Sequence, residues 1–583
     1  MTEFTYPTAP AVPLRPAEEV MDLERLGSLP ASRLSFVRSL IRQMARQRWQ
    51  ISHARFDLDD QGHGIAIYRL QTPQGRYHGV IFSQHLADDQ RSDRVIAQAW
   101  DVTFGVVEGD VDDALLEQMA ANVPLQEAGR QHPRLLVLSR ANRSLRNFAH
   151  FVDALSAGEQ PDPAWLTRVG YLYRTTAVYG NGKFGIADYV RLRDNPDFQR
   201  PFSAQMLAVY LLRHFSIEQV EHIARRRSPE AAVPMATELR RYLGIGNSTG
   251  LGMAPFLINH PQLIQQWVTC RETALALALA QTPDEDNRRR LIALTRRAML
   301  HLEQTVSEDA DQGARNAAIV AALPEVIAWL EEVPLEPDLW QQLVAWSART
   351  LPLEAQELVN TLLIELYPER VDPLEDRMGI EERLELTPDM PLVRLKQLIE
   401  THYDWALAED FERPEARHWF WYRSTEKEEP RLGVRGEEPG AEKELPLAIA
   451  PRVHHTHGVL SDFLEANPRA LVVEFLIAHP RHKDIVRRIQ SMVETPYGEI
   501  RANLWHRDMK PMHLLRTKLS FFGASRFDPK SDRWVRITLF QGAPLVEELN
   551  AEPRDLADFD DWSFPLEPEG VMHSQRQGAG ETS

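Results

Sequence analysis

The chain has 583 residues, of which 43% are hydrophobic and 26% are charged, as in an ordinary globular protein of about two to four domains. Its formal net charge of −18 argues against a general nucleic-acid-binding protein, which would present a basic face. A single cysteine, Cys270, excludes an intrachain disulfide framework and a cysteine-based zinc cluster.

The sequence shows no membrane or export signal. No apolar run approaches the roughly 20 residues that a membrane-spanning helix needs. Residues 1–16 lack the basic start and the apolar core of a secretory signal. We therefore expect a soluble cytoplasmic protein with neither a membrane partner nor a nucleic-acid partner.

The N-terminal part of the chain predicts an arm followed by a small domain. Residues 1–30 are rich in proline and lack an apolar period, which predicts an extended arm lying on another domain or subunit. Residues 31–142 are predicted to form an α+β domain. The elements expected there are a helix from Ser32, strands at 64–70, 77–82, 95–107 and 135–138, and a helix at 111–122. Pro73-Gln-Gly75 is a turn signal, so the first two of these strands should form a β-hairpin.

The middle of the chain has the apolar spacing of helices, and residues 143–408 are predicted to form a helical domain. No fixed repeat period is present, so a helical solenoid is not expected. The expected helices are 203–215, 217–227, 261–281, 286–305, 315–331, 337–348 and 390–408, with another over the leucine-rich segment 351–366.

The C-terminal part has a different composition. Residues 409–457 are predicted to form a charged loop or lid, and 458–565 a mixed α+β domain whose clearest strand is 534–540. Residues 566–583 are predicted to be a disordered tail. The fold class expected from the whole sequence is mainly α with α+β portions: a small N-terminal α+β unit, a central helical domain and a C-terminal mixed α/β region.

One stretch of the helical domain is rich in glycine, with four glycines between residues 244 and 252. Glycine permits left-handed backbone angles and close approach of a ligand, and a loop that opens a helix can turn several N–H groups towards one anion. We therefore expect a substrate-binding turn at a helix–helix joint. The residues expected to bind the substrate are Gly246, Asn247, Ser248, Thr249 and Gly250. A close-packed helix joint that needs small residues is the alternative.

The pattern G-x-x-x-G-x-G at 246–252 resembles the cofactor loop of the short-chain dehydrogenases, and Tyr179 and Lys183 stand at Y-x-x-x-K spacing. The resemblance covers seven residues and implies an NAD(P)-dependent oxidoreductase. In that family a buried strand precedes the loop, whereas residues 238–243 have a helical pattern here. The oxidoreductase is therefore the weaker alternative.

Two further stretches combine arginine with small polar residues. In 174–185, Arg174 is expected to clamp a carboxylate or phosphate and Asn181 to bind the same substrate. Lys183 is the first candidate for proton transfer, because a desolvated amine changes its pKa readily. In 139–146 an apolar strand gives way to a helix, and Arg143 is expected to bind the anion there. The alternatives are an ordinary turn with a solvated lysine, and arginines that face a neighbouring acidic domain.

The densest group of histidines is His454-His455-Thr456-His457. Imidazole is both an acid–base group and the commonest metal ligand. No carboxylate stands nearby at a recognised ligand spacing, so no metal site is assigned. His455 is the second candidate for proton transfer, and a plain surface loop is the alternative.

Together these patterns predict an enzyme that binds a small anionic metabolite, a carboxylate or a phosphate, in a pocket lined by Gly, Asn and Arg. The reaction class and any cofactor stay unassigned. The main alternative is a non-catalytic helical scaffold or binding protein, which the long helical middle and the proline-rich arm would suit. The oligomeric state stays open, and an acidic chain with an N-terminal arm is compatible with a homo-oligomer such as a homodimer.

Overall fold

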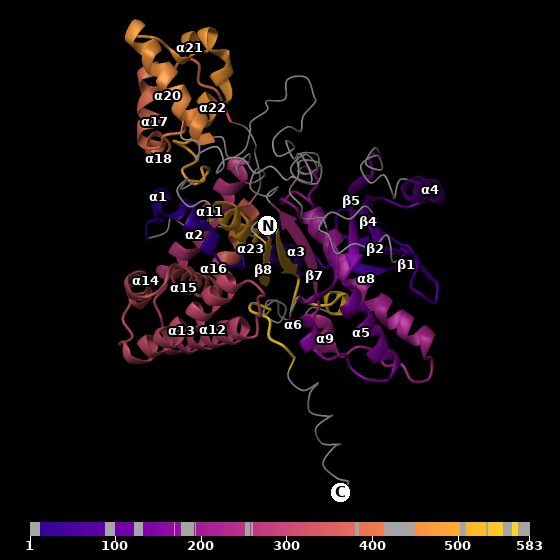
Figure 1. Ribbon diagram of the computed structural model, residues 1–583. Coiled ribbons are helices and arrows are strands. Elements are labelled where there is room, and N and C mark those ends of the chain that lie inside the picture. The colour runs from indigo at the N-terminus through magenta and orange to yellow at the C-terminus, as the bar shows by residue number, and fades with distance from the viewer. Residues whose placement is uncertain are drawn as a thin grey trace.

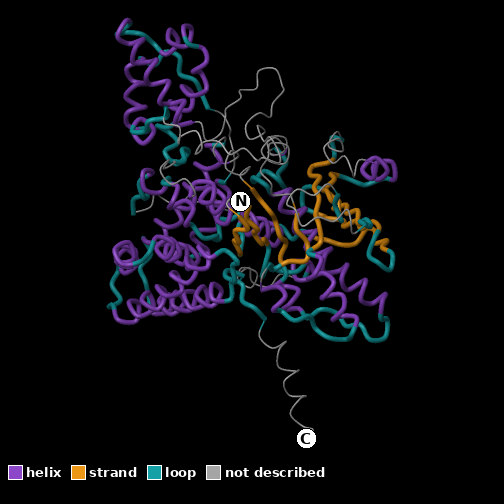
Figure 2. The backbone as a smooth tube through the Cα atoms, viewed as in Figure 1, coloured by secondary structure: helices purple, strands orange, loops and turns teal. Residues whose placement is uncertain are grey.

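The computed structural model of the chain describes residues 12–87, 99–121, 132–167, 169–175, 192, 194–250, 257, 260–378, 384–412, 449–501, 509–531, 534–551 and 562–568. Helices make up 55% of the structure and strands 15%. The strands join into one nine-stranded mixed sheet, which runs from one side of the molecule to its middle (Figures 1 and 2). The predicted fold class is therefore wrong, because a single sheet connects the N-terminal, central and C-terminal parts of the chain.

The sheet begins as an antiparallel meander and is then extended by strands from distant parts of the chain. Its order is β1-β2-β3-β4-β5-β6-β7-β9-β8, and every neighbouring pair is antiparallel except β6 and β7, which are parallel. The strands are β1 (Gln50–Leu58), β2 (Gly64–Gln71), β3 (Arg76–Ser83), β4 (Val102–Glu108), β5 (Leu135–Arg143), β6 (Tyr171–Thr175), β7 (Gly244–Gly250), β8 (Arg526–Ser531) and β9 (Trp534–Leu539).

The predicted β-hairpin is confirmed as β2 and β3. The turn is closed by the backbone of Thr72, whose N–H donates to the Gly75 carbonyl at 2.9 Å. The Thr72 hydroxyl accepts from the Gly75 N–H at 2.9 Å. A side chain that bonds its own turn in this way stabilises the reversal between the two strands.

Residues 244–250 of the glycine-rich stretch form the inner strand β7 and not a turn at a helix–helix joint, as the sequence predicted, and residues 251 and 252 lie outside the described residues. Its glycines allow neighbouring groups to approach closely. A Cβ on Gly246 would lie 2.4 Å from the Tyr171 ring, and one on Gly244 would lie 2.6 Å from the carbonyl oxygen of Leu539. The small residues therefore serve packing within the sheet.

Helix α8 (Ser203–Arg227) contacts each strand from β3 to β7, and α5 (Leu145–Ser156) packs against α8. Two helices were predicted over 203–227, but they form one continuous helix. Figure 1 shows α5 and α8 beside the strands of the N-terminal half. The other helices near this half are α3 (Phe36–Arg46), α4 (Asp113–Ala121), α6 (Ala164–Thr167), α9 (Thr237–Tyr242) and α24 (Val546–Asn550).

A second group of helices lies on the other side of the molecule (Figure 1). Its members are α1 (Ala17–Val20), α2 (Leu23–Ser28), α11 (Pro261–Leu279), α12 (Glu285–Glu303), α13 (Ala310–Glu332), α14 (Leu339–Thr350), α15 (Leu353–Leu366), α16 (Pro368–Val371), η3 (Asp372–Arg377) and α23 (Met509–Phe522).

A third group forms the helical lobe at the upper left of Figure 1. It consists of α17 (Leu392–His402), α18 (Asp404–Leu407), α20 (Ile449–Ala466), α21 (Val472–Ala478), η4 (Pro480–His482) and α22 (Lys483–Ser491). The predicted charged loop at 409–457 ends inside α20, and residues 413–448 of it lie outside the described residues.

Buried ion pairs hold the segment of α1 and α2 on helices α11 and α15. Arg15 and Arg25 each contact the Glu357 carboxylate of α15 at 2.6 Å, and Arg15 also contacts Glu272 of α11 at 2.7 Å. The Arg271 guanidinium contacts the other carboxylate oxygen of Glu357, at 3.2 Å. Both carboxylate side chains are fully buried, so these pairs are shielded from solvent and salt.

Among the helices in the described part of the chain, we find none with the length and apolar character needed to cross a membrane.

Candidate functional site

A cavity of about 810 Å³ opens where β5 ends beside β6 and α5 begins. Its described lining is polar on much of its surface and holds four arginines and two carboxylates. We call it the arginine cavity. It is lined by Leu86, Asp101, Asn142, Arg143, Ser144, Leu145, Arg146, Asn147, Ala164, Trp165, Val169, Tyr171, Arg174, Glu308 and Arg536.

The end of β5 is held in place by Asp101, just before β4. The Asp101 N–H donates to the side-chain oxygen of Asn142 at 2.8 Å, and the Arg143 N–H donates to the Asp101 carboxylate at 3.0 Å. The Ser144 N–H then donates to the Leu172 carbonyl at 2.7 Å. These bonds fix the backbone from which Asn142 and Arg143 project.

Helix α5 starts directly after this point, and its first residues line the cavity. The first N–H groups of a helix have no partner within the helix. Ser144 stands at the N-cap but its side chain makes no capping hydrogen bond. The start of α5 therefore adds the positive end of a helix dipole to the cavity wall.

The register of the sheet brings the remaining arginines to the same place. Arg174 pairs with Asn142 of β5 on one side and with Gly246 of β7 on the other. Gly246 in turn pairs with Thr538 of β9. Arg536 stands two residues from Thr538, and side chains two apart on a strand share a face. Arg174 and Arg536 therefore reach the cavity from strands far apart in sequence.

Arg143 is held rigidly inside the lining. Its Nε donates to the Tyr173 hydroxyl at 2.8 Å, and its guanidinium lies 4.5 Å from the centre of the Phe148 ring. Burial by itself would lower the pKa of Arg143, but its interactions with Tyr173 and Asp101 outweigh burial, so this pKa lies above its usual value. Arg143 is therefore a fixed positive charge.

Tyr171 forms the wall between the cavity and strand β7. Its ring lies directly over Gly246, which leaves room for it by having no side chain. Burial raises the pKa of the Tyr171 hydroxyl, and the positive charges of Arg536 and Arg174 act in the opposite direction. Both guanidinium groups therefore lie close enough to Tyr171 to act on its hydroxyl.

Three of the four arginines that line the cavity have no carboxylate partner, in contrast to most of the buried arginines among the described residues. Arg146, Arg174 and Arg536 form no ion pair with any residue that the structure describes. Of the two carboxylates in the lining, Glu308 accepts from the Lys530 ammonium at 3.1 Å, and Asp101 accepts from the Arg143 backbone. The cavity thus carries an excess of positive charge in a chain whose net charge is −18.

The structure brings two of the predicted site residues, Arg143 and Arg174, into this one cavity. Gly246 lies beneath its Tyr171 wall. Asn247 is fully buried and its side-chain amide donates to the Thr175 carbonyl at 2.8 Å, so it joins β7 to β6.

The remaining predicted residues lie elsewhere. The backbones of Ser248, Thr249 and Gly250 pair with β9. Asn181 and Lys183 lie outside the described residues. His455 lies on α20 of the helical lobe, with its ring 5.4 Å from that of His482, and it is not among the described residues that line the cavity.

Arg536 and Glu308 belong to the cavity but were not selected from the sequence. The strand at 534–540 was predicted, and its alternation could have placed Arg536 on the face opposite the buried Val535 and Ile537. The pairing of β9 with β7, which brings Arg536 to the cavity, has no local signal in the sequence.

Comparison with known proteins finds no matching family model, no matching curated protein and no matching solved structure.

Proposed function

We propose that the protein binds a small compound with carboxylate or phosphate groups in the arginine cavity. The observation that carries this proposal is the set of three arginines, Arg146, Arg174 and Arg536, that face one cavity without an ion-pair partner among the described residues. Guanidinium groups match carboxylate and phosphate oxygens in a two-pronged geometry. An anion with two or more negative charges would neutralise the excess positive charge of this lining.

Two further features support an anion of metabolite size. A cavity volume of about 810 Å³ lies within the range of about 300 to 1,000 Å³ that is usual for small-molecule sites. The uncapped start of α5 supplies N–H donors beside the arginines. The described lining holds no histidine, cysteine or lysine, so we assign it a binding role and name no catalytic residue.

The oxidoreductase alternative loses the geometry on which it depended. A dinucleotide loop needs glycines in a turn between a strand and a helix. In this structure the glycines of 244–250 lie within strand β7, directly after helix α9. We therefore do not propose a nicotinamide cofactor.

Isothermal titration calorimetry of the full chain tests the proposal with a panel of phosphate, pyrophosphate, citrate and succinate, and with glycerol as a neutral control. We expect at least one anion to bind, and Arg174→Ala and Arg536→Ala each to weaken it by about 10- to 150-fold. That range corresponds to the loss of one charge-assisted hydrogen bond, about 1.5 to 3 kcal/mol.

Arg76→Ala is the matched control, because Arg76 is an exposed arginine of the same sheet that pairs with Asp110 at 2.9 Å. It should leave the affinity unchanged. Equal affinity in all variants would contradict the proposal. Absence of binding by every anion at millimolar concentration, together with a stable protein partner in pull-downs, would favour the scaffold alternative.

A further inference from the structure

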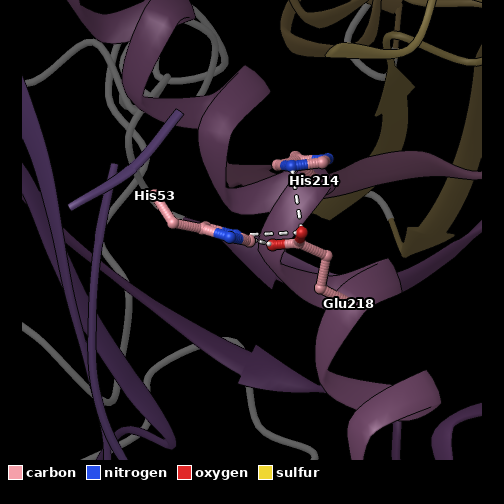
Figure 3. A group of neighbouring side chains, drawn as sticks. All are labelled: His53, His214 and Glu218. Carbon is pink, nitrogen blue, oxygen red and sulfur yellow. Dashed lines mark hydrogen bonds and ion pairs between the residues drawn. The ribbon is translucent and has the colours of Figure 1, made fainter. Parts of the chain in front are cut away.

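A group of three metal-ligating side chains lies outside the arginine cavity, where β1 faces helix α8 (Figure 3). His214 and Glu218 stand four residues apart on α8, so they project from the same side of the helix. His53 reaches them from β1 at the edge of the sheet. One ligand atom from each residue lies within 4.8 Å of the other two.

Two of the three distances between ligand atoms match those of a coordination shell, and the ligand nitrogens of the two imidazoles lie within 4.8 Å of each other. The Nε2 atoms of His53 and His214 lie 3.0 Å and 3.3 Å from the same carboxylate oxygen of Glu218. Two ligands bound to one ion at about 2.0 to 2.1 Å in tetrahedral geometry are separated by about 3.3 Å. A small ion could therefore be bound by all three groups with only slight movement of the side chains.

The strands β1 and β2 also position the group. His53 stands opposite Tyr68 in the pairing of β1 with β2, and the register shifts directly after His53. Such bulges redirect side chains and occur often beside functional sites. The Tyr68 hydroxyl donates to the second oxygen of Glu218 at 2.6 Å, which holds the carboxylate in its orientation towards the two imidazoles.

We propose that His53, His214 and Glu218 bind one divalent first-row transition-metal ion, with Zn²⁺ as the reference ion. Two imidazoles and one carboxylate are a ligand set used for zinc and for non-haem iron(II). Three protein ligands leave at least one coordination position for water or a substrate atom. The His53 side chain is 47% exposed, so the ion and a further ligand have access from solvent.

This inference goes beyond the anion site, because none of the three ligands lines the arginine cavity. The competing explanation is a group of hydrogen bonds in which two imidazoles and Tyr68 donate to one carboxylate. That explanation requires no ion, so metal uptake distinguishes the two.

The test is a titration of chelator-treated full-length protein with Co²⁺, followed by its visible absorption, with Zn²⁺ added as competitor. We expect one Co²⁺ per chain, displaced by Zn²⁺. His53→Ala and Glu218→Gln should weaken Co²⁺ binding by more than about 100-fold, and Tyr68→Phe by about 10- to 100-fold, which is typical for loss of a group that orients a ligand.

His222→Ala is the matched control. His222 lies one turn beyond Glu218 on α8 and contacts the Asp59 carbonyl at 2.9 Å, outside the group. It should leave Co²⁺ affinity unchanged. Circular dichroism of each variant separates loss of the site from loss of the fold, and His53→Ala alters only a half-exposed side chain on an edge strand. Absence of stoichiometric Co²⁺ uptake, or equal uptake by wild type and His53→Ala, would overturn the proposal.

Discussion

At the scale of single residues, the glycines of β7 determine how closely the wall of the arginine cavity can pack. Gly246 lies under the Tyr171 ring, and Gly244 lies against the backbone of β9. Neither position leaves room for a methyl group. Glycine is needed at these positions because it has no side chain and lets neighbouring groups approach closely. Ligand-binding loops need glycine for the same reason, so the two roles have the same sequence pattern.

We predict that Gly246→Ala lowers stability by about 1 to 3 kcal/mol, because the added methyl group must displace the buried Tyr171 ring or separate the strands. The same displacement changes the cavity wall, so anion binding should weaken as well. Thermal unfolding and calorimetry measure the two effects.

Gly313→Ala is the control for this substitution. Gly313 lies within α13, and a Cβ there would meet no atom within 4 Å. Replacing a helical glycine with alanine should stabilise the chain by up to about 1 kcal/mol. A Gly246→Ala protein as stable as Gly313→Ala would refute the packing role of Gly246.

At the scale of elements, α1 and α2 are attached to α11 and α15 through the buried Glu357 carboxylate. Burial alone would raise the pKa of Glu357, but Arg15, Arg271 and Arg25 outweigh burial and hold this pKa well below its usual range. A carboxylate with a depressed folded-state pKa stabilises the fold above its unfolded-state value of about 4.3. That contribution is lost as the pH falls below this value.

We predict that Glu357→Gln lowers stability at pH 7 by about 3 to 5 kcal/mol, because it removes the buried partner of Arg25 and leaves Arg15 and Arg271 sharing the single carboxylate of Glu272. Between about pH 5 and pH 3 the wild-type melting temperature should fall more steeply than that of Glu357→Gln, since only the wild type must protonate this group. Melting curves across this range provide the measurement.

Glu331→Gln serves for comparison. Glu331 pairs with Arg296 at 3.3 Å, and both side chains are more than half exposed. An exposed pair contributes at most about 1 kcal/mol, so this variant should behave like wild type. Equal effects of the two substitutions would show that the buried network does not hold the N-terminal helices.

The elements that could be predicted from the sequence are those with a strong local signal. In the hairpin of β2 and β3, the Thr72 hydroxyl accepts a hydrogen bond from the backbone of the turn at Gly75. In β9, the buried Val535 and Ile537 stand two residues apart, which is the period of a strand. The long helices α11 to α15 of the second group were also predicted, because their apolar spacing is sustained over several turns, whereas α1 and α2 lie where an extended arm was predicted.

Strand β7 could not be predicted, because it has glycine and polar residues where most strands have β-branched ones. Its stability comes from pairing with β6 and β9, which lie about seventy residues before it and almost three hundred after it. The same long-range pairing brings Arg536 to Arg174. Single residues of the site could therefore be chosen from their chemistry, but the group as a whole could not.

The metal-ligating group shows the same limit. His214 and Glu218 are four residues apart, but the sequence predicted them in two separate helices, 203–215 and 217–227, and the single helix α8 places them on one side. Their partner His53 belongs to β1, a strand that the sequence analysis did not identify. The ligand set became visible only when the sheet placed β1 beside α8.

At the scale of the whole molecule, the described helices of the lobe from α17 to α22 contribute no residue to the described lining of the arginine cavity. Helix α20 contacts α17, α18 and α22, which are all members of the lobe. Figure 1 shows this lobe at one end of the molecule and β5 on the opposite side. A residue of α20 should therefore have little influence on an anion in the cavity.

We predict that His455→Ala leaves the affinity for the anion within about twofold of wild type, because the two sites share no contact. Calorimetry with the anion that binds wild type best provides the measurement. A loss of tenfold or more would show that the lobe closes over the cavity and would restore His455 as a site residue.

The most direct test of the anion site is to locate a bound anion. Crystals of the full-length protein soaked in selenate would show anomalous scattering wherever the oxyanion binds. The arginine cavity predicts a selenium peak about 4 Å from a guanidinium nitrogen of Arg174 or Arg536, which places a selenate oxygen within hydrogen-bonding distance, about 2.7 to 3.2 Å, of that nitrogen. An empty cavity at selenate concentrations that label other sites of the protein would contradict the proposed function.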